Sequence, residues 1–215
     1  MIKIAPSILA ADPLNLERDV RRAVEAGCDW IHIDVMDAHF VPNLAYTPET
    51  VRRLRETFRV PLDVHLMMDR PETLLDAFIR AGADIITVHA EIPNAKEMLA
   101  EIRNRGLRAG IALRPATPLS QVRDLLGDAD LMLMMTVEPG FGGQQLEPEV
   151  LDKIGELAET GWAGEIEADG GIREDNLHLL AEKGLTVAVM GTALFGSDDM
   201  KTAIERCRAA GVSHG

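Results

Sequence analysis

Residues 31–43, IHIDVMDAHFVPN, begin as an apolar strand and then place two histidines and two aspartates within a short stretch. Charged side chains are rarely buried in a small domain unless they are paired or bind a metal ion. His32 and Asp34 are two residues apart, so on a strand they point to the same side. The stretch therefore raises the question of what these side chains hold.

One histidine and one aspartate from elsewhere in the chain could complete a metal site with His32 and Asp34. His65 ends a later apolar stretch, and Asp169 ends another one much farther along the chain. Two imidazoles and two carboxylates suit a divalent transition ion such as Zn, Fe(II), Mn or Co. Each histidine alone could equally be a hydrogen-bonded structural residue, and no single spacing is a tight metal motif. The prediction of a metal rests on the whole set.

The elements that must position these residues follow a recurring pattern. An amphipathic stretch is followed by glycine and then by a short apolar stretch, as in EAGCDWIHID, RAGADIITVH and EKGLTVAVMG. Glycine is the preferred residue just past a helix C-terminus. The pattern predicts eight buried strands, at about residues 2–6, 30–35, 62–66, 84–89, 108–113, 131–136, 164–169 and 186–190. Alternation with helices favours a single-domain (β/α)8 barrel, a TIM barrel, over residues 1–215; the alternative is an open doubly wound sheet.

Several residues that could take part in chemistry lie at or near the C-terminal ends of these predicted strands. In a (β/α)8 barrel the C-terminal strand ends form one rim, which carries the active site. Residues distant in sequence therefore converge there. The residues expected at this rim are Ser7, His32, Asp34, His65, His89, Arg114, Thr136, Asp169 and Gly191.

Three glycine-containing turns follow the last three predicted strands: EPGFGGQ at 138–144, DGG at 169–171 and GT at 191–192. Each alone could be a tight turn. Together they predict a phosphate site, because glycine lets backbone N–H groups approach an oxyanion closely. The turns lack Lys and Arg, which favours binding by backbone amides and a helix N-terminus.

Three methionines, Met36, Met67 and Met135, also follow predicted strands at this rim. Methionine commonly fills gaps in a hydrophobic core. The alternative is a soft apolar wall that excludes water from a reactive intermediate.

Composition limits the possible partners and the location. The formal net charge of −13 disfavours nucleic acid and anionic membranes. No apolar stretch has the length of a membrane helix, and the start of the chain does not resemble a signal peptide. Cys28 and Cys207 lie far apart without metal-type spacing and fit reduced thiols. We expect a cytoplasmic protein.

Motifs along nearly the whole chain resemble the ribulose-phosphate 3-epimerase family. They are SILAAD, HIDVMDAHFVPN, HLM, HAE, PATPL, MTVEPGFGGQ, DGGI and VMGTALF, in this order. The resemblance implies a (β/α)8 barrel that interconverts D-ribulose 5-phosphate and D-xylulose 5-phosphate through an enediolate, with one divalent ion per chain. It also implies a homo-oligomer, either a dimer or a hexamer.

The resemblance assigns roles to individual residues. The metal ligands would be His32, Asp34, His65 and Asp169, with Asp34 as proton acceptor and Asp169 as proton donor. Contacts to a phosphorylated ketose would come from Ser7, His65, Gly140, Phe141, Gly142, Gly143, Asp169, Gly170, Gly171, Gly191 and Thr192. Met36, Met67 and Met135 would shield the enediolate, and His89 would not be a ligand.

Three residues depart from the family pattern. Ala38 replaces a usual glycine, Arg114 a usual asparagine, and Glu138 a usual asparagine or aspartate. We expect Arg114 and Glu138 to face each other as an ion pair in a shielded rim; the alternative places Arg114 on the substrate phosphate. These departures keep two other functions open: an epimerase for a related ketose phosphate such as D-allulose 6-phosphate, and a non-catalytic phosphosugar-binding barrel.

Overall fold

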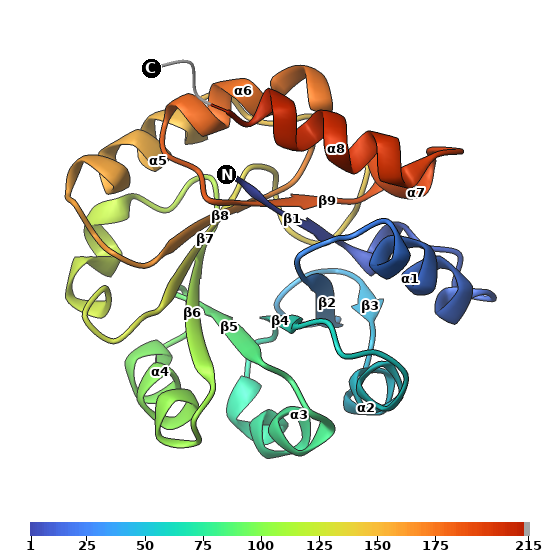
Figure 1. Cartoon of the computed structure of the whole chain (residues 1–215). Coiled ribbons are helices and arrows are strands. Elements are labelled where there is room, and N and C mark those ends of the chain that lie inside the picture. Colours follow the sequence, from blue (N-terminus) through green and yellow to red (C-terminus); the bar gives the residue numbers. More distant parts are fainter. Residues whose placement is uncertain (213–215) are drawn as a thin grey trace.

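The computed structural model describes residues 1–212 and shows a ring of strands surrounded by helices (Figure 1). Eight parallel strands in this part of the chain follow the order β1-β9-β8-β7-β6-β5-β4-β2. A bridge between Ser7 and His32 joins the first strand to the last. The sheet is therefore the predicted (β/α)8 barrel, and the open doubly wound alternative is wrong. The strands are β1 (Lys3–Pro6), β2 (Ile31–Asp37), β4 (Leu62–Met67), β5 (Ile85–His89), β6 (Arg108–Leu113), β7 (Leu131–Met135), β8 (Glu165–Asp169) and β9 (Val187–Met190).

The helices lie outside the ring (Figure 1). They are α1 (Leu16–Glu25), α2 (Pro48–Thr57), α3 (Leu75–Ala81), α4 (Ala95–Asn104), α5 (Val150–Glu159), α6 (Glu174–Glu182), α7 (Thr192–Phe195) and α8 (Met200–Ala210). Short 3₁₀ helices are η1 (Ile8–Ala10), η2 (Pro71–Thr73) and η3 (Leu119–Leu125). None of the helices within residues 1–212 combines the length and apolar character needed to cross a membrane.

Two elements differ from a regular alternation of strand and α-helix. Between β6 and β7 the connection is the 3₁₀ helix η3, which Pro118 precedes and Gly127 closely follows. This tighter helix suits a short connection. A two-residue strand, β3 (Leu44–Ala45), pairs antiparallel with the end of β2.

Glycines end the helices as the repeated pattern predicts. The five glycines at these positions all have positive φ, between 71° and 101°: Gly27, Gly82, Gly106, Gly161 and Gly184. A residue with a Cβ is strained in this conformation. At these five places glycine therefore fixes where the helix stops and the following strand begins.

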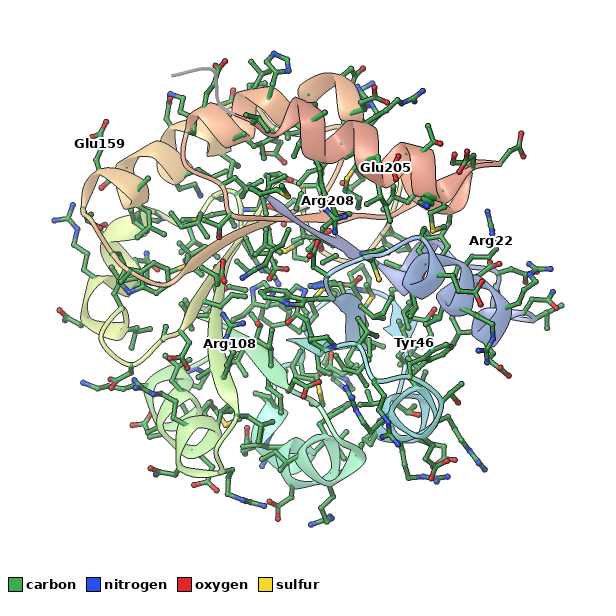
Figure 2. All side chains as sticks on the ribbon, in the orientation of Figure 1. Arg22, Tyr46, Arg108, Glu159, Glu205 and Arg208 are labelled. Atoms are coloured by element: carbon green, nitrogen blue, oxygen red, sulfur yellow. The ribbon has the colours of Figure 1, made fainter. Side chains whose placement is uncertain are left out.

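Strand alternation separates two kinds of side chain. Ile31, Ile33 and Val35 of β2 point out of the ring into the hydrophobic layer beneath the helices. His32 and Asp34 alternate with them and are buried inside the ring. Side chains fill the ring, whereas Glu159 on α5 lies at the outer edge of the molecule (Figure 2). The fold therefore holds the polar residues of β2 in the barrel interior.

Ala38, just after β2, has a φ of 60°, in the left-handed region that favours glycine. We expect Ala38→Gly to raise the free energy of unfolding by ~1 kcal/mol, because glycine relieves this strain. Urea denaturation at equilibrium measures the change. The control is Ala209→Gly on helix α8, where glycine should lower the free energy of unfolding by ~0.5–1 kcal/mol. Destabilisation by both changes would contradict the assignment of strain at Ala38.

Candidate active site

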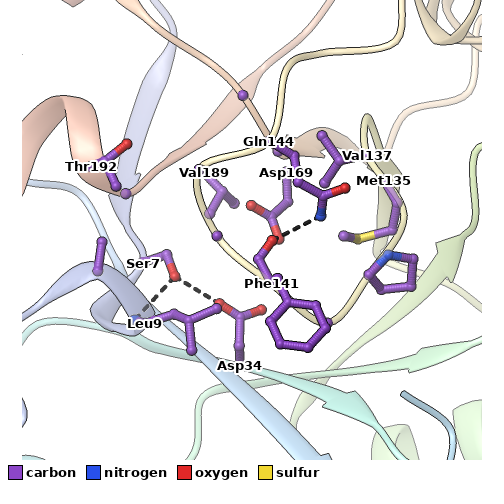
Figure 3. A pocket seen from close by; sticks show the side chains of 18 of the residues that line it. Ser7, Leu9, Asp34, Met135, Val137, Phe141, Gln144, Asp169, Val189 and Thr192 are labelled. Carbon is purple, nitrogen blue, oxygen red and sulfur yellow. Dashed lines mark hydrogen bonds between the residues drawn. The ribbon is translucent and has the colours of Figure 1, made fainter. Parts of the chain in front are cut away.

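A pocket opens at the rim where the parallel strands end (Figure 3). Its walls contain Asp34, in the middle of β2, and Asp169, at the end of β8. Other predicted substrate-binding residues also line it: Ser7, Gly140, Phe141, Gly142, Gly143, Gly170, Gly171, Gly191 and Thr192. His65 does not line the pocket and lies buried beside Asp34.

The four predicted metal ligands come together at the base of this pocket. One donor atom from each of His32, Asp34, His65 and Asp169 lies within 4.8 Å of the others. Asp34 Oδ1 is 3.3 Å from His32 Nε2 and 3.2 Å from His65 Nδ1. Asp169 Oδ2 is 4.0 Å from His32 Nε2. The register explains this closeness, since Asp34 of β2 pairs directly with His65 of β4.

The hydrogen bonds of His32 fit a cation at this point. Its Nδ1 lies 2.6 Å from Asp63 Oδ2, where an N–H can donate to the carboxylate. Its Nε2 is buried and has no hydrogen-bond partner in residues 1–212, and it faces Asp34. Burial opposes a charge on His32, but Asp34 and Asp63 outweigh burial and raise its pKa well above the usual value. A positive charge is therefore favoured between His32 and Asp34, and the donor set suits a divalent transition ion.

The two pocket carboxylates differ in their affinity for protons. Burial favours protonation of Asp34, but His32 and His65 outweigh it and hold the pKa of Asp34 well below its usual range. Ser7 Oγ also donates a hydrogen bond to Asp34 Oδ2 at 2.7 Å. Burial, together with the nearby charge of Asp34, raises the pKa of Asp169 to about 7. At neutral pH Asp34 is therefore ionised, whereas a substantial part of Asp169 is protonated.

The glycine turns lie together on one side of the pocket. Gly140, Gly142 and Gly143 follow β7, Gly170 and Gly171 follow β8, and Gly191 follows β9. A Cβ on Gly171 would lie 2.4 Å from the backbone nitrogen of Leu146, so the neighbouring loops are packed backbone to backbone. The close packing leaves this position available only to glycine.

The structure corrects the prediction that this region lacks a cationic side chain. Arg173, at the start of α6, lines the pocket beside Gly171, and its Nε donates to Asp175. Its position four residues after Asp169 in DGGIRED could have revealed it, because a rim loop this short stays beside the pocket. The other pocket residues that were not predicted are Leu9, Ala10, Val137, Pro139, Gln144, Ile172 and Val189.

The three methionines form an apolar wall of the pocket. Met36, Met67 and Met135 are each at most 4% exposed, and each lines the pocket. Their burial fits the core role, and their place in the pocket wall fits a role in excluding water, which stays a prediction. The two interpretations of these residues are therefore compatible.

Comparison with known proteins gives the family. A profile of the ribulose-phosphate 3-epimerase family matches residues 3–195. The chain belongs to the ribulose-phosphate 3-epimerase family. Ribulose-phosphate 3-epimerase of Bacillus subtilis is 43% identical over 98% of this chain and 100% of the relative. The chloroplastic ribulose-5-phosphate-3-epimerase of Arabidopsis thaliana is 42% identical over 97% of this chain and 77% of the relative.

The fold recurs in more distant proteins. The crystal structure of KGPDC from Streptococcus mutans superposes with a TM-score of 0.75 at 16% identity, covering 98% of this chain and 97% of that chain. At this identity the similarity shows the barrel fold alone. It confirms the architecture of this epimerase-family enzyme.

Two residues that depart from the family pattern face each other at the rim. Arg114 Nη1 is 3.8 Å from Glu138 Oε2, so the expected ion pair forms. The pair is not shielded, because the Glu138 side chain is 56% exposed. Arg114 is held mainly by Phe40: Nη2 donates to its carbonyl oxygen at 2.9 Å, and the guanidinium lies 4.3 Å from its ring centroid.

These contacts predict unequal effects of the two residues on stability. Glu138→Gln should change the free energy of unfolding by ~0–1 kcal/mol, because it removes only an exposed ion pair. Arg114→Gln should lower it by ~2 kcal/mol, because it removes a charged hydrogen bond and a cation–π contact. Urea denaturation of both variants and the double variant measures this difference. Equal losses from the two single variants would contradict it.

Proposed function

We propose that this chain is a metal-dependent 3-epimerase that interconverts D-ribulose 5-phosphate and D-xylulose 5-phosphate. The observation that carries the proposal is the pair Asp34 and Asp169 on different walls of one pocket (Figure 3). Their pKa values move in opposite directions, so at neutral pH one serves as base and the other as acid. The substrate is taken from the names of the relatives.

Epimerisation inverts one carbon, which requires proton removal on one face and proton delivery on the other. Asp34, ionised and held by Ser7, accepts the proton from C3. Asp169 then donates a proton to the opposite face, and the reverse reaction exchanges these roles. Neither residue needs a partner from outside the pocket to complete the transfer.

The buried histidines suit the metal part of the proposal. His32 and His65 would hold a divalent ion together with Asp34 and Asp169. When bound, such an ion supplies Lewis-acid stabilisation of the negative charge that develops on the substrate after proton removal. His32 is orientated by Asp63, which fixes the nitrogen that faces the ion.

The remainder of the pocket suits a phosphorylated ketose. Backbone amides of the glycine turns after β7, β8 and β9 would bind the phosphate, and Arg173 adds a positive charge beside them. Met36, Met67 and Met135 would shield the reacting carbon from water. In this proposal the phosphate and the reacting carbon would lie in different parts of one pocket.

Turnover measured by NMR on two ketose phosphates tests the proposal. With a divalent ion present, D-ribulose 5-phosphate should be converted faster than D-allulose 6-phosphate. If D-allulose 6-phosphate were converted faster, the proposed substrate would be wrong but the proposed reaction type would stand. Binding of both sugars without turnover of either would favour a non-catalytic phosphosugar-binding barrel and overturn the proposal.

A further inference from the structure

A chain of buried polar groups runs from the metal-ligand cluster into the wall of the barrel. His65 Nδ1 faces Asp34, and the opposite ring nitrogen, Nε2, lies 2.8 Å from His89 Nε2. His89 Nδ1 lies 3.0 Å from Glu91 Oε2. Both imidazoles are fully buried, so each of these contacts must be satisfied within the protein.

Glu91 determines which nitrogen donates in each of these hydrogen bonds. Its other oxygen, Oε1, accepts hydrogen bonds from the backbone N–H of Arg114 at 2.9 Å and from the Thr117 hydroxyl at 2.5 Å. Burial favours its protonation, but the bonds from His89, Thr117 and Arg114 outweigh burial and lower the pKa of Glu91 to about 2. Glu91 is therefore a carboxylate, and it can only accept from His89.

The protons of both imidazoles follow from this direction. Both rings are fully buried, and burial disfavours a charge on either of them, so both are taken as neutral. A neutral imidazole carries one N–H. His89 uses its N–H, on Nδ1, to donate to Glu91, so its Nε2 accepts. His65 can then pair with His89 by donating from Nε2, which leaves its Nδ1, beside Asp34, to a divalent ion instead of to a proton.

The lone pair on Nδ1 is the one the metal site needs. His65 Nδ1 is the ring nitrogen that lies beside Asp34, within the cluster of possible ligand atoms. We call the hydrogen-bonded series His65, His89 and Glu91 the relay. Packing holds it in place, since the centroid of the Phe40 ring lies 4.6 Å from that of the His89 ring. The opposite tautomer of His65 would place a proton where the ion has to sit.

We propose that His89 and Glu91 are positioning residues for metal binding: through the hydrogen bonds between them and His65, they keep His65 in the tautomer whose Nδ1 is free to bind a divalent ion. The proposal rests on the proposed function, because it assumes that His65 is a ligand. It assigns a role to two residues that contact neither the ion nor the pocket.

Glu91→Gln tests the direction of the relay with almost no change in shape. Bonds from Arg114 and Thr117 keep the amide oxygen of the new side chain on their side, so its NH₂ faces His89. His89 Nδ1 must then accept, and the protons along the relay shift so that His65 carries its proton on Nδ1. We expect Zn²⁺ affinity, measured by competition with a chromophoric chelator, to fall ~10–100-fold.

Substitutions at His89 separate positioning from packing. A glutamine there retains an acceptor for His65 and a donor for Glu91, so His89→Gln should keep Zn²⁺ affinity within ~3-fold of the wild type. His89→Leu fills the space but leaves the His65 N–H unpaired, and its affinity should fall ~10–100-fold. Both variants should still bind one ion at saturation. The exposed Glu97→Gln on α4 is the matched control.

A second measurement needs no substitution. Long-range ¹H–¹⁵N NMR spectra of the Zn²⁺-loaded wild type report which ring nitrogen of each neutral histidine carries the proton. His65 should be protonated on Nε2 and His89 on Nδ1. A wild type that binds no Zn²⁺ would refute the proposed metal site. A wild type that binds Zn²⁺, but is matched in affinity by Glu91→Gln and His89→Leu or shows the opposite tautomers, would refute the relay alone.

Discussion

Asp34→Asn and Asp169→Asn are each expected to lower epimerase turnover by ~10²–10⁴-fold, because each removes one of the two proton-transfer groups. Both side chains lie in the pocket wall, and their pKa values are shifted in opposite directions. An amide of the same shape can neither accept the substrate proton nor supply one. Turnover of D-ribulose 5-phosphate measures the loss, in protein whose metal content has been determined.

The two variants should differ in partial reactions. Asp169→Asn keeps the base Asp34, so it should still exchange the C3 proton of one epimer with solvent without forming the other. Asp34→Asn should show the same behaviour with the opposite epimer. The control is Asp152→Asn on α5, whose side chain is 85% exposed. Near-normal turnover by either metal-loaded pocket variant would exclude the two-carboxylate assignment.

Exhaustive chelation is the second change with a large expected effect. Loss of a Lewis acid that contributes several kcal/mol should lower turnover by ~10³-fold or more, and adding back a suitable divalent ion should restore it. Elemental analysis of gently purified protein should show about one ion per chain, in line with the one four-residue group of possible ligands found within residues 1–212.

Histidine variants connect this loss to the proposed ligands. His32→Gln and His65→Gln should each reduce the metal content, whereas His178→Gln, on the exposed side of α6, should not. An ion at 100 times its dissociation constant should also stabilise the folded protein by ~2.7 kcal/mol. Full activity in protein with no detectable metal would show that the cluster serves another purpose.

Most of the barrel could be predicted because its determinants are local. Each of the eight parallel strands lies within two residues of its predicted bounds, and five of them are apolar runs that follow a helix that glycine ends. β3 could not be predicted, because Leu44 and Ala45 form a strand only through their pairing with Met36 and Asp37 of β2. The 3₁₀ form of η3 could not be predicted either, because it depends on the distance that the connection between β6 and β7 has to cover.

The composition of the candidate site could be predicted, but its internal chemistry could not. Once the barrel is recognised, inward-facing positions of β2 and β8 bring His32, Asp34 and Asp169 together. The tautomer of each histidine and the opposite pKa shifts depend on buried partners at known distances, such as Asp63 for His32. The ion pair between Arg114 and Glu138 could be predicted, but its exposure and the contact of Arg114 with Phe40 could not be read from the sequence.

Proton exchange at C3 of D-ribulose 5-phosphate in D₂O is the most direct test of the account. With metal-loaded enzyme, proton NMR should show deuterium entering at C3 while D-xylulose 5-phosphate forms, since both Asp34 and Asp169 exchange their protons with solvent through the pocket. Deuterium at C1 would indicate a different isomerase reaction. Absence of both exchange and product, in folded protein with its ion bound, would contradict the two-carboxylate epimerase.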